Sequence, residues 1–206
     1  AFAAMRLRFD DPPGSTRFEN AVDPSGANDG VCTGTTCPTA GVSGRDNQAV
    51  RFDGVDDMVT TALVIDPSDT GEGATLMAWA FPESASAGNH QVISSDAGGH
   101  AWSLLRQGGE WCVFTGAARH CFAGVTVDVG QWQHIAVAFD PASDNTVTFY
   151  KNGAAVGNTT LPGGLITSGR TVAIGYNPGN GGEFFDGRVD DVRIIATALP
   201  AANVAI

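Results

Sequence analysis

The chain has 206 residues, of which 43% are hydrophobic and 16% charged, a balance that excludes an intrinsically disordered protein and fits one domain spanning residues 1–206. The net charge of −11 makes nucleic acid an unexpected partner, because an acidic surface repels phosphate. No apolar run is long enough for membrane insertion.

Short runs with strand character follow one another along the chain, beginning at residues 5–10, where apolar and charged residues alternate. Residues 19–48 are polar and rich in glycine, and we expect a long loop there. Further strands are expected at residues 49–52, 75–81, 92–95, 101–106, 111–114, 120–122, 132–139, 147–150, 171–175 and 184–195. Because turn residues separate these runs and no helical period is found, the sequence predicts an all-β sandwich or barrel.

The run at residues 147–150 leads into a specific turn signal. Lys151 is followed by Asn152 and Gly153, the dipeptide that most easily adopts a tight hairpin turn with positive φ. An antiparallel hairpin is therefore expected at this point.

The four cysteines form two close pairs. Cys32 and Cys37 bracket a short loop, and Cys112 and Cys121 lie on two runs that look like facing hairpin strands. A zinc site is the alternative, but there is no Cys-x-x-Cys and the histidines are scattered. We expect two local disulfides, which implies an oxidising, extracytoplasmic setting.

Several motifs in order resemble a laminin-G-like domain of the concanavalin A-like lectin/glucanase superfamily, in the form found in long bacterial secreted or surface proteins. They lie at residues 49–57 (A-V-R-F-D-G-V-D-D), 75–79 (T-L-M-A-W), 130–136 (G-Q-W-Q-H-I-A), 150–153 (Y-K-N-G), 174–175 (I-G), 185–194 (F-D-G-R-V-D-D-V-R-I) and 199. The resemblance covers residues 49–199 and implies a jelly-roll sandwich of two antiparallel sheets, a non-catalytic binding role and frequent calcium.

Glycoside hydrolases share this superfamily, and their catalytic carboxylates would be recognisable in the sequence. The hydrolases of this fold place two or three acids on one strand, as Glu-x-Asp-x-Glu, on the same face. The five glutamates here have no acidic partner at that spacing on an expected strand, and neither a Gly-x-Ser-x-Gly nor a His-Glu-x-x-His motif is present. The chain is not expected to be an enzyme, and a divergent glycosidase is the less favoured alternative.

The resemblance implies a structural calcium ion at Asp190, with backbone carbonyls that map near Asp10 and Asn47. Strand alternation cannot decide whether Asp190 or Asp191 points inward, because both faces of this run carry apolar residues. The alternative for Asp190 is an ion pair with Arg188, Arg193 or Arg8. Two weaker sets of acids are Asp53 with Asp56 and Asp57, which also fit a turn, and Asp96 with Glu183 at the sandwich rim.

Ligand contacts are expected from aromatic side chains and from one loop. Trp79 and Trp132 match core positions of the family, which leaves Trp102 and Trp111, with Arg106 on the same face as Trp102, as ligand-binding candidates. The long polar loop that follows residue 175 adds Tyr176, Asn177 and Glu183.

These observations predict an extracellular binding or adhesion module, one unit of a larger secreted or cell-surface chain, that binds a glycan or an extracellular protein. The alternative in another class is a structural spacer without a ligand. In a spacer, Trp102 and Trp111 would be buried and the sheet faces would lack exposed aromatic side chains.

Overall fold

The computed structural model describes residues 3–65, 71, 73–96, 102–115, 118–164 and 169–204. Regular structure in these ranges is almost entirely β, and its two helices, η1 (Gly34–Thr36) and η2 (Ala201–Asn203), are single 3₁₀ turns. Neither is long enough to cross a membrane.

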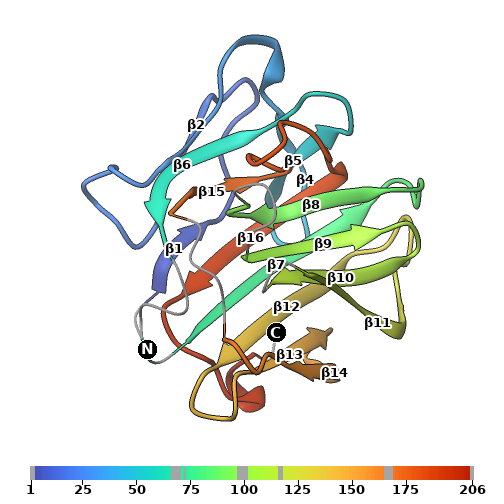
Figure 1. Ribbon diagram of the computed structural model, residues 1–206. Helices are drawn as coiled ribbons and strands as arrows, with labels where there is room; N and C mark the ends of the chain where they lie inside the picture. The colour runs from blue at the N-terminus through green and yellow to red at the C-terminus, as the bar shows by residue number, and fades with distance from the viewer. Residues whose placement is uncertain are drawn as a thin grey trace.

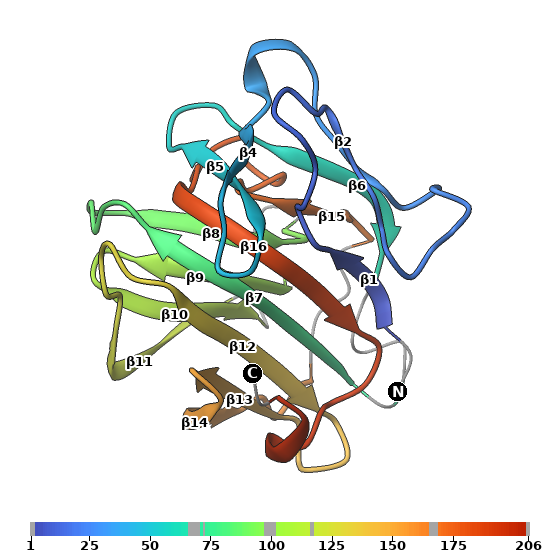
Figure 2. The ribbon, with the colours of Figure 1, turned by 180° about the vertical axis from the view of Figure 1, so that it is seen from behind.

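The strands form two antiparallel sheets that lie face to face (Figures 1 and 2). Sheet A has eight strands in the order β14-β13-β12-β7-β16-β5-β4, and β1 pairs with β16 off this path. Its strands are β1 (Ala3–Leu7), β4 (Thr39–Ser43), β5 (Gln48–Asp53), β7 (Ala74–Pro82), β12 (Gln133–Asp140), β13 (Thr146–Lys151), β14 (Ala154–Thr160) and β16 (Asp186–Ile195).

Sheet B also has eight strands, in the order β11-β10-β9-β8-β15-β6-β3-β2. They are β2 (Arg17–Phe18), β3 (Gly30–Val31), β6 (Val59–Val64), β8 (Asn89–Ser94), β9 (Trp102–Gln107), β10 (Glu110–Thr115), β11 (Ala118–Thr126) and β15 (Thr171–Ile174). The expected jelly-roll sandwich of two antiparallel sheets is confirmed.

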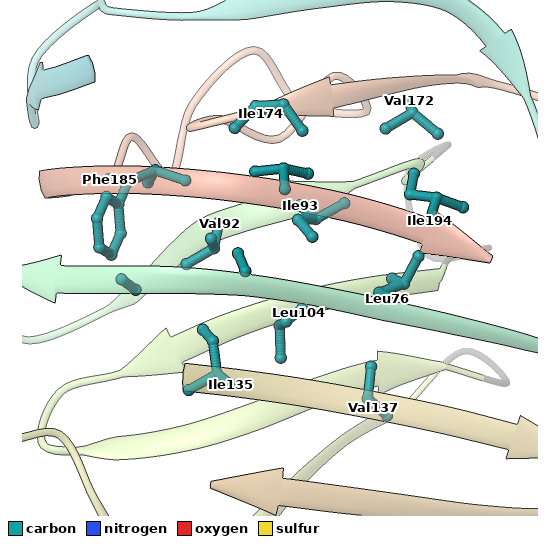
Figure 3. Close-up of a cluster of buried hydrophobic side chains, with 14 of the residues drawn as sticks. Leu76, Val92, Ile93, Leu104, Ile135, Val137, Val172, Ile174, Phe185 and Ile194 are labelled. Carbon is teal, nitrogen blue, oxygen red and sulfur yellow. The ribbon is translucent and has the colours of Figure 1, made fainter. Parts of the chain in front are cut away.

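The core fills the space between the sheets. Figure 3 shows Leu76, Ile135 and Ile194 of sheet A together with Leu104 and Ile174 of sheet B, all of them buried. Each such side chain stabilises the fold by about 1.5–3 kcal/mol through loss of apolar surface to water. Alternation along the strands supplies this layer, because every second side chain faces the same side.

The strands expected from the sequence all overlap observed ones, but β2, β3, β4, β6 and β14 were missed. The prediction of one loop over residues 19–48 was wrong in part, because this segment contains β3, η1 and β4. Apart from the hairpin turn that precedes it, β14 gave no signal, because most of its side chains are exposed at the edge of sheet A and no apolar alternation is required there.

The local predictions about turns and disulfides are confirmed. Asn152 and Gly153 have φ values of 51° and 80° in the β13–β14 turn, as a two-residue hairpin requires. Cys32 is joined to Cys37, and Cys112 to Cys121, with Cα–Cα separations of 5.0 and 4.1 Å.

Candidate functional site

Asp190 lies at the point along β16 where the neighbouring strand changes from β5 to β1. β5 pairs with β16 up to Val189, and β1 pairs with it from Val192 onward. Asp190 and Asp191 therefore lie at the junction, and Asp191 adopts a φ of 43° in a bulge against β7. The bulge explains why simple alternation could not assign these two residues to a face.

Asp190 pairs in register with Trp79 and lies on the face of sheet A that is turned away from the core. The turn between β4 and β5 covers it, and its Oδ2 accepts the backbone N–H groups of Arg45 and Asp46 at 2.9 and 3.1 Å. The residue is only 2% exposed, and this burial raises the pKa of its carboxyl group to about 6.

Two residues of the predicted calcium site lie together. Asp190 and Asp10, the latter predicted to contribute a backbone carbonyl, line one small cavity of about 60 Å³ together with Asp46, Asp191, Arg6 and Arg8. Hard oxygen ligands of this kind suit calcium, so the donor set fits the ion in part. Asp10 is also held in place, since its Oδ1 accepts the backbone N–H of Gln48 at 3.2 Å.

The ion pairs with arginine that were the alternative for Asp190 are made instead by its neighbour, Asp191. Asp191 accepts hydrogen bonds from Arg6, at 2.7 Å from Nε to Oδ1, and from Arg193. Burial would raise the pKa of Asp191, but these bonds outweigh it and the pKa is lowered. Among the residues that the structure describes, no ion pair reaches Asp190.

The two other predicted metal ligands lie differently. Asn47 sits in the turn above Asp190 with a φ of 58°, and its carbonyl accepts the N–H of Gly44 at 3.2 Å. Asp53 lies instead at the end of β5, where ligand atoms of Asp53, Asp56 and Asp57 come within 4.8 Å of one another. This cluster closes a turn, since Asp53 Oδ1 accepts the N–H groups of Val55 and Asp56.

The predicted tryptophan platform is wrong, because both residues belong to the core. Trp102 is 3% and Trp111 0% exposed, so neither ring presents a face to a sugar. Trp111 Nε1 donates to Gln133 Oε1 at 2.9 Å, which satisfies its polar atom inside the sandwich. Strand alternation sorts the residues of a strand onto two faces but does not show which of the two faces is buried.

Arg106 is likewise fully buried and cannot contact a ligand. Its guanidinium group donates to the Ser86 carbonyl at 3.0 Å and to the hydroxyls of Ser84 and Ser86 at 3.2 Å. Arg106 therefore ties the loop before β8 to the sandwich, and burial lowers its pKa.

Polar side chains from β8 and from the loop after β15 do converge, and we call them the Glu183 cluster. Its members are Asn89 and Gln91 on β8, Asp96 just beyond it, Asn177, Asn180 and Glu183 on the loop, and Arg119 on β11. Glu183 Oε1 accepts from Asn89 at 3.1 Å, and its Oε2 accepts from Gln91 at 2.5 Å and from Asn177 at 3.0 Å. Two of the three loop residues predicted from the sequence thus lie in this cluster.

Asn177 is the centre of the loop. Its Nδ2 also donates to Asp96 Oδ2 at 2.8 Å, its Oδ1 accepts from Gly179, and its backbone bonds to Gly181 and Gly182. Because Asn177 is 3% exposed, it positions the loop and does not itself face a ligand. The ring of Tyr176 lies half-buried beside the cluster, stacked on Phe184 at a centroid distance of 6.2 Å.

Arg119 reaches the cluster from β11, which is an edge strand of sheet B. Its Nη1 donates to Asn89 Oδ1 at 2.9 Å, although β10 and β9 lie between the two strands. This bond therefore crosses the outer face of sheet B. Planar amide, guanidinium and carboxylate groups gathered on one surface can hydrogen-bond the hydroxyl groups of a saccharide from several sides.

The sequence reasoning missed a group of aromatic side chains on the outer face of sheet A. Trp79, Phe81 and Trp132 are half-buried there, and not in the core as predicted for the two tryptophans. Phe81 and Trp132 lie 5.5 Å apart, with Arg188 over Phe81 at 4.8 Å. The sequence signal for this group was the spacing of Trp79 and Phe81, which lie two positions apart on one expected strand and therefore share a face.

Comparison with known proteins gives a family and a fold. The family model described as the concanavalin A-like lectin/glucanases superfamily matches residues 52–205. A search of curated proteins found no match.

Several solved structures share this fold at low sequence identity to this chain. The fourth domain of an extracellular arabinanase from Geobacillus stearothermophilus, solved with arabinotriose, aligns with a TM-score of 0.70 at 19% identity, over 98% of this chain and 96% of that one.

The receptor-binding domain of botulinum neurotoxin type G aligns with a TM-score of 0.66 at 10% identity, over 99% of this chain and 50% of that one. Trypanosoma rangeli sialidase, in complex with sialic acid, aligns at 0.69 and 13% identity, over 98% of this chain and 32% of that one. These likenesses establish the fold, and the family match over residues 52–205 shows that the chain belongs to the concanavalin A-like lectin/glucanases superfamily.

Proposed function

We propose that this chain is a non-catalytic, extracellular carbohydrate-binding module whose sugar-contacting surface is the Glu183 cluster. The observation that carries the proposal is the convergence of the amides of Asn89 and Asn180, the guanidinium group of Arg119 and the carboxylate of Glu183 on one surface. None of these four side chains is needed to fill the core, since all are half-buried or exposed.

Two further observations support the proposal. The arabinanase domain of the same fold was solved with arabinotriose, and a saccharide ligand is therefore compatible with this sandwich. The two disulfides support an extracytoplasmic setting, in which such bonds persist. The family resemblance supports a place within a longer secreted or cell-surface protein.

A structural calcium ion belongs to the same proposal. Asp190 and Asp10 would supply carboxylate oxygens, and the turn that carries Asn47 would supply backbone oxygens. The ion would neutralise the buried charge of Asp190 and fix the β4–β5 turn on sheet A. It would act on stability and not on the sugar directly, since Asp190 lies under the β4–β5 turn on sheet A, whereas Glu183, in the loop before β16, contacts β8 of sheet B.

The proposal is tested by titrating a panel of soluble polysaccharides into the protein by calorimetry. The Asn89→Ala and Arg119→Ala variants should each weaken binding about tenfold, because each removes a hydrogen bond to a sugar hydroxyl. Glu110→Gln is the matched control, since Glu110 is exposed on β10 outside the cluster. Unchanged affinity in both cluster variants would contradict the placement of the site.

The spacer alternative is favoured by the burial of Trp102 and Trp111. It also required sheet faces without exposed aromatic side chains, and among the described residues the aromatic side chains are buried or, like Phe81 and Trp132 on sheet A, half-buried. A panel in which no polysaccharide binds would favour the spacer or a protein ligand.

A further inference from the structure

The Glu183 cluster depends on a backbone conformation that is unusual for a residue with a side chain. Glu183 has a φ of 58°, in the left-handed region, which such a residue adopts only where its surroundings hold it there. The Gln91 N–H donates to the Glu183 carbonyl at 2.9 Å, and Nδ1 of His90 lies 2.6 Å from the Phe184 carbonyl oxygen. Two consecutive carbonyl groups of the loop are therefore tied to β8.

His90 acts on the cluster from the side that faces away from a ligand. It pairs in register with Arg106, whose side chain shares the inner face of β9 with the core residue Leu104. Asn89 and Gln91, its neighbours on β8, point to the opposite face and reach the Glu183 carboxylate there. His90 therefore influences the cluster through the backbone that it holds, and not by touching a ligand.

The hydrogen bond to Phe184 fixes which nitrogen of the His90 ring carries a proton. A carbonyl oxygen can only accept, so Nδ1 must be the donor. Nε2 of the neutral ring is then an acceptor, and the hydroxyl oxygen of Ser86 lies 3.2 Å from it. Both ring nitrogens have a partner in this arrangement.

Arg106 holds the other end of this chain of hydrogen bonds. Its buried guanidinium group donates to the hydroxyl of Ser86 at 3.2 Å and to the carbonyl of the same residue at 3.0 Å. Buried donors are costly to leave without acceptors, so Ser86 is kept in place beside His90. A continuous path of hydrogen bonds thus runs from Arg106 through Ser86 and His90 to the loop that carries Glu183.

We infer that His90 is a positioning residue of the Glu183 cluster, because its Nδ1–H group fixes the backbone at residues 183 and 184 and thereby aims the Glu183 carboxylate at the ligand. The inference rests on the proposed carbohydrate-binding function and adds to that site a residue on the opposite face of β8.

The test begins with calorimetric titration of soluble polysaccharides, among them arabinan, xylan, galactan and alginate, into the wild-type protein. His90→Ala should weaken binding of the polysaccharide so identified about tenfold, because the loop loses one hydrogen bond to β8. His90→Asn should restore most of the affinity, since the asparagine amide can donate to the same carbonyl. Asn158→Ala, on the exposed edge strand β14 of the other sheet, is the control and should bind like the wild type.

Rescue by asparagine separates the Nδ1–H group from the bulk of the ring, because asparagine restores the donor and not the ring. Nitrogen NMR of the imidazole in the wild-type protein measures the tautomer directly and does not depend on how any variant folds. We expect the neutral ring to carry its proton on Nδ1. A proton on Nε2, unchanged affinity in His90→Ala, or an affinity of His90→Asn as low as that of His90→Ala would each overturn the inference.

The failure of this inference is distinguishable from the failure of the proposed function. Polysaccharide binding that persists in His90→Ala would contradict the inference alone and leave the proposed function standing. Binding of no polysaccharide to the wild-type protein would contradict the proposed function, and with it this inference.

Discussion

The amide nitrogen of Asn177 donates to Asp96 Oδ2 at 2.8 Å and thereby joins the loop after β15 to the end of β8. The two residues are 81 positions apart in the sequence, and both are nearly inaccessible to solvent. A buried carboxylate that loses a hydrogen-bond donor incurs a desolvation cost, and Asn177 donates to the carboxylates of both Asp96 and Glu183. The geometry of the loop therefore depends on this one side chain.

Replacing Asn177 should destabilise the protein. Asn177→Ala removes donors from Asp96 and Glu183 together, and we expect a loss of about 2–3 kcal/mol in the free energy of unfolding. Urea unfolding measures this change, with Asn158→Ala on the exposed edge strand β14 as a matched control. A loss no greater than that of the control would show that the loop does not depend on Asn177.

Calcium should raise the midpoint of thermal unfolding relative to EDTA. A ligand that binds only the folded chain stabilises it by about 2.7 kcal/mol when its concentration is a hundred times its Kd. Asp190→Asn should abolish this shift, because the buried carboxylate charge is lost. Asp144→Asn is the control, since Asp144 lies exposed in a turn with a φ of 54° that asparagine also accepts. A shift that survives in the Asp190 variant would remove Asp190 from the metal site.

Asp57 and Asp190 should each contribute a free energy of unfolding that rises, without calcium, as the pH falls from about 6 towards about 4. Burial raises the pKa of both from 3.8 to about 6, so these two groups bind protons more tightly in the folded chain, whereas His134, whose pKa burial lowers to about 4, contributes the opposite slope. The stabilisation is present below the folded-state pKa and is lost as the pH rises through it.

Asp57→Asn should remove part of this slope and stabilise the protein at pH 7 by roughly 1 kcal/mol, after allowance for solvent screening. Urea unfolding in EDTA at several pH values gives the measurement, and Asp56→Asn in the same turn is the control. A slope identical to that of the wild type would show that Asp57 is charged at no cost.

The tryptophans should differ sharply in their contribution to stability. Trp111→Ala should cost about 3–5 kcal/mol, because it opens a cavity in the core and removes one of the two donors to Gln133 Oε1. Trp132→Ala, on the outer face of sheet A, should cost much less, since the ring is half-buried. Chemical unfolding of the two variants in parallel compares them directly. Similar losses of unfolding free energy would contradict the placement of Trp111 in the core and Trp132 outside it.

Each disulfide should stabilise the fold modestly because the loops are short. The bonded residues are 5 and 9 positions apart, for which loop-closure entropy gives about 2–3 kcal/mol per bond. Replacing either pair with alanine and measuring urea unfolding tests this value. Thiol labelling of the folded wild type should find no free cysteine, and a labelled pair would show that its disulfide does not form.

The strands rich in apolar residues were predictable from the sequence, and those without an apolar pattern were not. β7 and β12 lie in the middle of sheet A, where almost all of their side chains are buried, so each contains a nearly continuous apolar run. β14 needs no alternation at the edge, and β6 buries Thr61, whose hydroxyl is satisfied by the Val172 carbonyl at 2.8 Å. A buried threonine of this kind is invisible to a pattern of apolar residues.

The site followed a similar division. The loop residues Asn177 and Glu183 were found because a long polar loop is unusual in a compact sandwich. Asn89 and Arg119 were not found, because their meeting depends on how β8 and β11 lie across the outer face of sheet B. Trp102 and Trp111 were misassigned because alternation gives two faces without saying which is buried.

The fold class, the family motifs and the two disulfides were predictable from the chain alone, since each depends on residues close together or on the order of motifs along the sequence. The folded molecule was needed to show that Asp190 faces the β4–β5 turn, that Trp102 and Trp111 are buried, and that Glu183 meets Gln91 from 92 positions away. The physical reason is that these facts depend on strand order, on a bulge and on the choice of inner face, none of which leaves a local pattern in the chain.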